Sequence, residues 1–586
     1  MLSSSAPVAL GIALSVVLTS LPAQSGAFLV QDIATGATSS GANSIVDAAG
    51  VAYFRAYDPA IGTELYRTNG KTPGTALVLD INQGAGSSFP GQFTLLRSSV
   101  LFTATTPGQG TELWRSEGGA LNTGIVTDLM PGSASSSPSW LTVVAGWVYF
   151  AAEGPGVGRE LFRSDGTPQG TKLLMDIRPG ASGSDPANLV MHGNFLFFTA
   201  DDGVRGRELW MSDGTFTRMV ADIRSGAQGS DPDQLVSVGT TLYFTADDGN
   251  IGRELWAAGQ FGAVSLLRDI LPGSVGSSPT ALTRVGDRLF FQATTLNEGA
   301  EPWVSSGTTA TTILLGDLNP GGSSSAATGF AALGTQAVFS ARDAANGNEL
   351  WISDGTPAGT RIILDIRSGS TGSFPRSLTS VGNRQVFFVA DDGVVGAELW
   401  RTDGTPGGTK LVTDILAGPQ SSLVDGLCFS NGTLLFAADD GVKGLELWGV
   451  DPGATAQEVG VGTKTVGPPP QLSIGDPVMG QKVDLRLRYS YGGLYGVVVF
   501  GFPPADGHHI DMGWATTIYV DLRLPAFFLP MRVDIDGVYK LTGETVPNSP
   551  SSLGQQLIVQ AAIGPTGSPP LFSDLSNAVL LTINNF

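Results

Sequence analysis

The stretch Glu398-Leu-Trp-Arg-Thr-Asp-Gly-Thr405 recurs along the chain at a nearly fixed spacing. The glutamate that begins this stretch occurs in nine units, and successive glutamates lie 46 to 49 residues apart. A glycine stands two residues before the glutamate in every unit. The nine positions are Glu64, Glu112, Glu160, Glu208, Glu254, Glu301, Glu349, Glu398 and Glu446. Repetition at a period of this length predicts stacked copies of one structural unit.

The unit around Glu398 contains four short runs, at 377–381, 385–390, 398–402 and 409–415, that read as β-strands. Turns rich in Asp, Gly and Pro separate them. Four strands in a unit of about 48 residues are typical of a propeller blade. We therefore predict an all-β protein with a large β-propeller of about nine four-stranded blades; eight blades plus an extra unit is the alternative. The first strand, at 28–33, is a candidate to pair with the last blade and close the ring.

These units resemble the ELWxxDGT repeat of bacterial secreted proteins. The match is best at 160–167, 208–215, 349–356 and 398–405, and it extends over roughly 28–460. The resemblance implies an extracellular β-propeller, and the family brings no assigned activity with it.

Three further segments complete the predicted organisation. Residues 1–27 carry no charged side chain, are largely apolar from 8 to 21 and end in Ser-Gly-Ala, which indicates a secretory signal peptide. The propeller would then occupy 28–465. A proline-rich linker follows at 466–470. Alternating runs in 471–586 predict a β-sandwich, which is similar to the C-terminal modules of planctomycete-type secreted proteins.

Composition excludes several classes of function. The 586 residues carry a net charge of −20 with only 32 Lys and Arg, which argues against nucleic-acid binding. The single cysteine, Cys428, excludes an internal disulfide and a cysteine-based zinc site. No segment after residue 27 reaches 18 apolar residues, so no membrane span is expected in the mature chain. We expect a secreted, extracellular or cell-surface protein.

The repeated acids have two interpretations. The main one is structural: each glutamate accepts hydrogen bonds that fix its blade, since a catalytic pair is needed once and not nine times. The tryptophan two residues later, present in seven units, then packs between blades. The alternative is calcium, which prefers oxygen ligands, at the loop Asp-Asp-Gly-x-x-Gly-x-Glu. The candidate ligands are Asp201, Asp202, Glu208, Asp247, Asp248, Glu254, Asp391, Asp392, Glu398, Asp439, Asp440 and Glu446.

Catalytic residues are not marked by any motif. The three histidines are His192, His508 and His509, and His192 is expected in a solvent-facing turn. The third unit adds Trp140, a candidate for stacking on sugars. We therefore expect a non-enzymatic binding or scaffold protein that acts outside the cell on a glycan or a protein. The alternatives are a carbohydrate-active hydrolase or lyase with acids from distant blades, and a calcium-stabilised structural protein of the cell surface.

Overall fold

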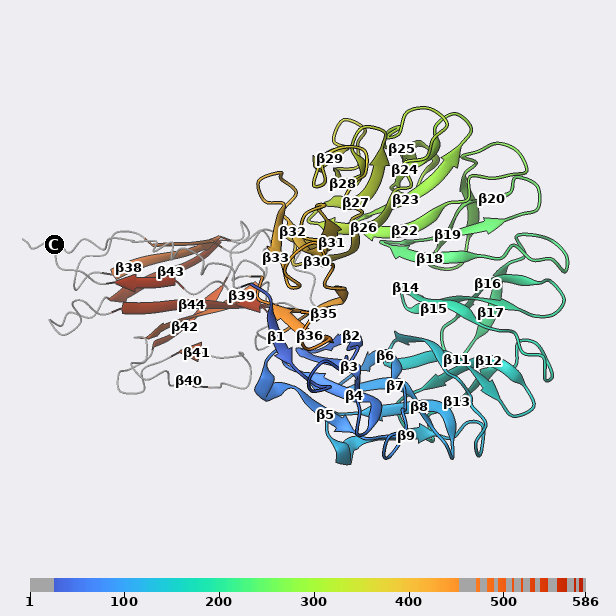
Figure 1. The fold of residues 1–586 in the computed structure, drawn as a ribbon, viewed down its shortest axis with the longest axis horizontal. Coiled ribbons are helices and arrows are strands. Elements are labelled where there is room, and N and C mark those ends of the chain that lie inside the picture. Colours follow the sequence, from blue (N-terminus) through green and yellow to red (C-terminus); the bar gives the residue numbers. More distant parts are fainter. Residues whose placement is uncertain are drawn as a thin grey trace, which may run out of the picture. The chain divides into compact units, whose positions relative to one another are not determined.

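The structure is a computed structural model that describes residues 26–452 and, beyond them, the backbone of the strands between 471 and 582. Contacts divide the chain into two units, one of which spans 22–457. Within 26–452 the strands form nine four-stranded antiparallel sheets. Figure 1 shows these sheets as blades around a ring, coloured in chain order from blue to orange. The predicted nine-bladed propeller is confirmed, and the alternative of eight blades plus one unit is wrong.

The innermost strands surround the propeller axis, and each contacts the innermost strand of the next blade. From blade 1 to blade 9 they are β2 (Asn43–Ala48), β6 (Gly91–Leu96), β10 (Ser139–Val144), β14 (Ala187–His192), β18 (Asp233–Val238), β22 (Thr280–Val285), β26 (Thr328–Leu333), β30 (Arg376–Val381) and β34 (Asp425–Ser430). The second strands are β3 (Val51–Asp58), β7 (Ser99–Thr106), β11 (Trp147–Gly154), β15 (Phe195–Asp201), β19 (Thr241–Asp247), β23 (Arg288–Thr295), β27 (Gln336–Asp343), β31 (Gln385–Asp391) and β35 (Thr433–Asp439).

The third strands begin at or just before the repeated glutamates. They are β4 (Gly62–Thr68), β8 (Gly110–Ser116), β12 (Gly158–Ser164), β16 (Arg207–Ser212), β20 (Arg253–Gly259), β24 (Gly299–Ser305), β28 (Gly347–Ser353), β32 (Ala397–Thr402) and β36 (Leu445–Val450). The outer strands are β5 (Ala76–Leu79), β9 (Thr123–Thr127), β13 (Lys172–Met175), β17 (Thr217–Ala221), β21 (Val264–Arg268), β25 (Ile313–Leu314), β29 (Arg361–Leu364), β33 (Lys410–Thr413) and β1 (Phe28–Gln31). Short 3₁₀ turns lie at Thr72–Gly74, Ala120–Asn122 and Thr309–Thr311.

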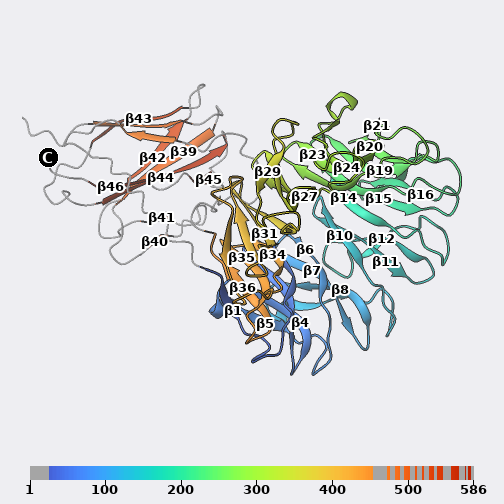
Figure 2. The ribbon, with the colours of Figure 1, turned by 45° about the horizontal axis from the view of Figure 1, so that its top comes forward.

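The two ends of the repeat region meet in blade 9. Strand β1 pairs antiparallel with β36, so that Phe28 lies opposite Gly449 and Leu29 opposite Trp448. In Figure 2 the blue β1 and the orange β36 lie next to each other. The first strand therefore completes the last blade, as the sequence suggested, and it satisfies a sheet edge that would otherwise be open.

Apolar side chains between the blades form the core. The middle residue of each second strand is a phenylalanine with no exposed surface, as at Phe291. It lies opposite the aromatic residue of the third strand, here Trp303. Trp303 also packs with Tyr243 and Leu255 of the preceding blade. The prediction that these tryptophans serve inter-blade packing is confirmed.

The segment after the propeller also forms antiparallel strands. Its strands are β37 (Gln471–Ile474), β38 (Lys482–Arg488), β39 (Leu494–Gly501), β40 (His509–Ile510), β41 (Ile518–Tyr519), β42 (Phe527–Arg532), β43 (Val538–Thr545), β44 (Gln556–Pro565), β45 (Asp574–Leu575) and β46 (Val579–Thr582). Strand β38 pairs with β37 and β43, β39 pairs with β42 and β44, and β44 also pairs with β45 and β46. A β-sandwich here stays a prediction. The linker at 466–470 and the predicted signal peptide, up to residue 25, lie outside the described residues.

Candidate functional site

Each repeated glutamate fastens one blade to the loop that leads into the next blade. Glu349, at the start of β28, is fully buried. Its carboxylate accepts hydrogen bonds from the Ser373 amide at 2.8 Å and the Ser373 hydroxyl at 2.6 Å. The amides of Ile366 and Arg367 donate to the same carboxylate at 3.2 and 3.1 Å. These four bonds hold the connection from β29 to β30 in place.

A glutamate–serine clamp of this kind occurs in all nine blades, with the serine donating through its amide, its hydroxyl or both. Its serine lies 22 to 24 residues after the glutamate in the chain, as in Glu64 with Ser88 and Glu208 with Ser230. In blade 9 the serine comes from the start of the repeat region: Glu446 accepts hydrogen bonds from the amide and the hydroxyl of Ser40. The structural interpretation of the repeated glutamates is confirmed. The serine partner was not predicted, although six of the nine serines stand in a repeated Ser-x-Pro sequence that would have revealed it.

Burial raises the pKa of each clamp glutamate above its ordinary value, and the hydrogen bonds from serine and backbone amides oppose that rise only in part. A carboxyl whose folded-state pKa is raised contributes stability below its unfolded pKa and loses it as pH rises through the folded pKa. With nine such groups, we expect the free energy of unfolding to fall as pH rises above the ordinary glutamate pKa of about 4.3.

Urea unfolding at several pH values, in 0.5 M salt to screen surface repulsion, measures this trend. The Glu112→Gln variant should show a shallower pH dependence than the parent chain, because one of the nine titrating groups is gone. A free energy of unfolding that rises from pH 5 to pH 8 would contradict the assignment.

The repeated aspartates before Ile or Leu lie in the same loops. In five blades the Oδ2 atom accepts a hydrogen bond from the glycine amide four residues later, as from Gly84 to Asp80 at 3.1 Å and from Gly321 to Asp317 at 3.0 Å. In blade 9 Asp32 instead accepts from the Lys443 ammonium at 3.0 Å. These acids shape the connections between blades.

The predicted calcium loop has its carboxylates turned toward its own backbone. Asp201 accepts from the Gly203 amide at 2.7 Å, and Asp202 accepts from the amides of Val204 and Arg205 at 2.9 and 2.7 Å. Asp247 and Asp248, Asp391 and Asp392, and Asp439 and Asp440 repeat this pattern.

Arginines from the preceding blade contact the first aspartate in several of these loops. Arg178 pairs with Asp201 at 3.3 Å and Arg367 with Asp391 at 2.7 Å. The glutamate of each loop belongs to the buried clamp. In the part of the chain that the structure describes, no three His, Cys, Asp or Glu side chains gather as a metal site. Calcium binding by these loops stays a prediction.

His192 lies in the core, and its expected place in a solvent-facing turn is wrong. It ends the innermost strand β14, where its side chain is 1% exposed. Its Nδ1 lies 2.8 Å from the Ser237 hydroxyl of the next blade. Ser430 and Asp47 make the equivalent contact between blades 9 and 1 at 2.6 Å. We assign both contacts to blade packing, because no acid among the described residues bonds the Nε2 atom of His192.

The surface that differs from blade to blade lies where the chain enters each innermost strand. The residue two positions before that strand has a φ between +45° and +55° in all nine blades. We call these nine residues the axial rim: Gly41, Phe89, Ser137, Asp185, Asp231, Ser278, Ala326, Phe374 and Leu423. Eight of them are not glycine although this left-handed conformation favours glycine. The repeat geometry thus imposes the backbone, and the side chains vary on it.

The axial rim has two dissimilar halves. Blades 7, 8, 9, 1 and 2 are consecutive around the ring and carry the apolar arc Ala326, Phe374, Leu423, Gly41 and Phe89. Phe89, Phe374 and Leu423 expose more than half of their surface. Blades 3 to 6 carry the polar arc Ser137, Asp185, Asp231 and Ser278.

Arginine side chains form hydrogen bonds to the backbone of the polar arc. Arg159, Arg207 and Arg253 each donate to a rim carbonyl, at 2.8 to 2.9 Å. Arg159 also lies 3.6 Å from the Asp185 carboxylate. Each of these arginines directly precedes a clamp glutamate, so the clamp positions the polar arc.

Neither a protein-family model nor a curated protein sequence matches the chain. The resemblance to ELWxxDGT-repeat proteins therefore remains a prediction. Several solved structures are similar in fold. A puromycin hydrolase is 16% identical over 63% of this chain and 61% of its own, with a TM-score of 0.33. A prolyl endopeptidase is 9% identical over 79% of this chain and 56% of its own, with a TM-score of 0.38.

A third similar structure is the β-propeller domain of the Trilobed protease from Pyrococcus furiosus. It is 10% identical over 56% of this chain and 98% of its own, with a TM-score of 0.30. The chain spans about three fifths of the length of the puromycin hydrolase. The described residues hold no helix that is long and apolar enough to cross a membrane.

These findings correct the expectation of a non-enzymatic binding or scaffold protein. The similar structures are a puromycin hydrolase, a prolyl endopeptidase and the β-propeller domain of a protease. The repeat pattern reports how blades pack, and it does not distinguish a binding propeller from a propeller of an enzyme. Secretion stays a prediction, as does the nature of the partner.

Proposed function

We propose that the chain is a peptidase-like propeller whose axial rim receives an extended polypeptide for hydrolysis. The observation that carries polypeptide binding at the rim is the apolar arc. Phe374, Leu423 and Phe89 expose large apolar surfaces on blades 8, 9 and 2, and only Gly41 of blade 1 separates the last two. Exposed apolar residues that gather in this way mark an interaction surface, whereas scattered ones need no explanation.

The chemistry of the arc favours a polypeptide. Leu423 and Ala326 are aliphatic and gain most from contact with other apolar side chains, while sugar rings present hydroxyl groups at their edges. The polar arc lies across the axis. Its backbone carbonyls and the carboxylates of Asp185 and Asp231 can accept hydrogen bonds from the backbone N–H groups of the same ligand. An unfolded segment with apolar side chains fits both halves.

Replacing Phe89, Phe374 and Leu423 together by asparagine tests the proposal. Asparagine adopts the left-handed backbone readily, so the loops should keep their shape. We expect binding of a reduced, carboxymethylated protein, followed by fluorescence anisotropy, to weaken at least tenfold, because each lost side chain removes about 1–3 kcal/mol of apolar contact. Cleavage of the same substrate, followed by mass spectrometry, should fall in parallel.

The matched control replaces Val204, Val394 and Val442 by asparagine. These valines are 69–70% exposed and lie in the loops between second and third strands, outside the axial rim. The control should bind and cleave like the parent chain. Equal behaviour of the rim variant and the parent chain, or a parent chain that neither binds nor cuts polypeptides, would refute the proposal.

A carbohydrate-active hydrolase or lyase is the second candidate, and a feature of the polar arc favours it. Asp185 and Asp231 are acids of neighbouring blades on the axial rim. Trp140, which is 46% exposed, lies at the start of β10, the innermost strand of the blade next to that of Asp185. A carboxylate pair beside an exposed aromatic ring suits sugar chemistry. Product release from a polysaccharide, lost in Asp185→Asn and Asp231→Asn, would favour this candidate over the first.

A further inference from the structure

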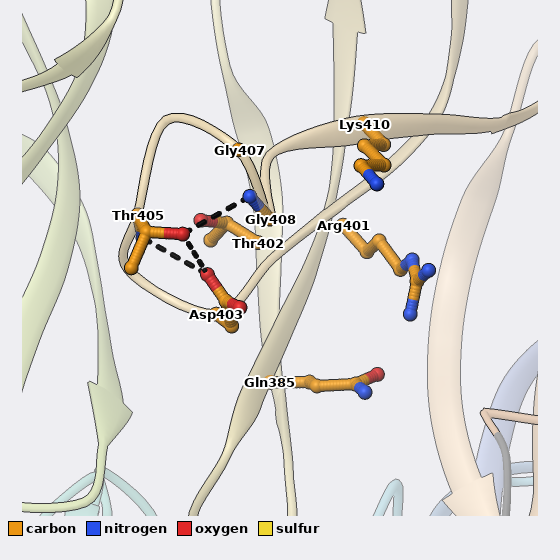
Figure 3. A pocket seen from close by; sticks show the side chains of 8 residues that line it. All are labelled: Gln385, Arg401, Thr402, Asp403, Thr405, Gly407, Gly408 and Lys410. Carbon is orange, nitrogen blue, oxygen red and sulfur yellow. Dashed lines mark hydrogen bonds between the residues drawn. The ribbon is translucent and has the colours of Figure 1, made fainter. Parts of the chain in front are cut away.

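Blade 8 contains a polar cavity of about 340 Å³ where its third strand ends and its outer strand begins. Gln385 from β31, Arg401 from β32 and Lys410 from β33 line it, and the turn 403–408 closes one side. Figure 3 shows these three side chains extending toward the same space, away from the turn. The cavity is separate from the axial rim, since it lies between the strands of a single blade.

Two positive charges face each other in this cavity. Arg401 and Lys410 are direct cross-strand partners of the β32–β33 pair. Like charges in this relation destabilise a sheet unless an anion lies between them. Among the described residues, neither side chain belongs to an ion pair. The cavity therefore favours a negatively charged ligand.

Asp403, the acid nearest to Arg401 in sequence, does not neutralise these two positive charges. Asp403 accepts hydrogen bonds from the amide and hydroxyl of Thr405, at 3.0 and 2.7 Å, within the turn. Figure 3 shows its carboxylate directed at Thr405. With this acid counted, the cavity still carries a net charge of about +1.

Blade 2 shows what the equivalent arginine binds when an acid is available. Arg115 occupies the position of Arg401, and its guanidinium bonds the Glu117 carboxylate. The same guanidinium donates to the Ser99 hydroxyl at 2.9 Å, and Ser99 occupies the position of Gln385. This corner of the blade thus accommodates a carboxylate against the arginine.

The side-chain carbonyl of Gln385 needs a hydrogen-bond donor from the ligand. Its Oε1 atom is buried and bonds no described residue. A buried acceptor without a partner is costly, so a ligand that offers an N–H or O–H group there gains binding energy. The cavity combines two cations for a carboxylate with one acceptor for a neighbouring donor.

We propose that this cavity binds the free carboxyl end of a peptide, with the carboxylate on Arg401 and Lys410 and the last amide N–H on Gln385. A planar guanidinium matches a carboxylate through two parallel hydrogen bonds, and lysine adds a point charge. The inference stands apart from the role proposed for the axial rim.

Calorimetric titration of the full chain with N-acetylalanine tests the proposal, since this molecule carries a carboxylate beside an amide N–H. We expect saturable binding that weakens with added salt, and at least a tenfold loss of affinity for N-acetylalanine amide, which has no carboxylate. Arg401→Gln should also lose at least tenfold, and Lys410→Gln and Gln385→Ala severalfold.

Arg67→Gln is the matched control, because Arg67 is the equivalent arginine of blade 1 and lies opposite Ala76. It should bind N-acetylalanine like the parent chain, and thermal unfolding should confirm that all variants are folded. Absence of binding, or equal affinity in Arg401→Gln, would overturn the proposal. Tighter binding of glucuronate than of N-acetylalanine would also overturn it, and would assign the cavity to an acidic sugar.

Discussion

Replacing Glu349 with alanine is expected to lower the free energy of unfolding by about 3–5 kcal/mol. The change removes four hydrogen bonds and leaves the amides of Ile366 and Arg367 without their acceptor, while the Ser373 amide keeps its bond to the Asn348 carbonyl at 2.9 Å. Buried donors without partners cost more than the bonds themselves contribute. Chemical unfolding followed by tryptophan fluorescence measures the loss.

Asp354→Ala is the matched control for this experiment, because it removes an acid from an exposed turn of the same blade. Asp354 accepts hydrogen bonds from Thr356 at 2.9 and 2.7 Å on the surface. Its loss should cost about 1 kcal/mol or less. Equal effects of the two substitutions would mean that the buried clamp is not what holds neighbouring blades together.

Replacing Val30 with aspartate is expected to open the ring. Val30 lies in β1, is 1% exposed and packs in the cluster shared by blades 9 and 1. A buried charge without a partner costs more than about 4 kcal/mol, which exceeds what one short strand gains from pairing. Hydrogen exchange should then accelerate in β36 and in blade 1, with the blades opposite them least affected.

Val442→Asp is the control for this change, since Val442 belongs to the same blade but is 70% exposed. It should leave hydrogen exchange and thermal stability close to those of the parent chain. Slow exchange throughout β36 in Val30→Asp would contradict the closing role of β1.

The local features of the fold follow from the sequence because they depend on short-range patterns. The fourfold strand pattern around Glu398 reappears as β30 to β33, with boundaries that differ by at most two residues. The structural role of the glutamates could also be predicted from the sequence, because nine copies of a buried acid require nine sets of hydrogen-bond donors. Calcium binding by the same loops is the interpretation that stays open.

Features that depend on contacts between blades could not be predicted in the same way. His192 precedes a glycine turn in sequence, yet it is buried because β14 extends to the turn and the next blade covers it. Phe89 and Leu423 are 334 residues apart, and closure of the ring places them two blades apart on one arc. No property of a single repeat reveals that arc.

The axial rim exists as a ring only if β1 completes blade 9, so the closing contact tests the account most directly. Asp32 directly follows β1, and its carboxylate lies 3.0 Å from the Lys443 ammonium. A carbodiimide, which joins carboxylates and amines in direct contact, should link these two residues in the native chain. Peptide mass spectrometry should detect the Asp32–Lys443 amide, and Lys443→Gln should abolish it. If Asp32 instead couples only to an added amine while Lys443 remains free to be acetylated, the closed nine-bladed ring is contradicted.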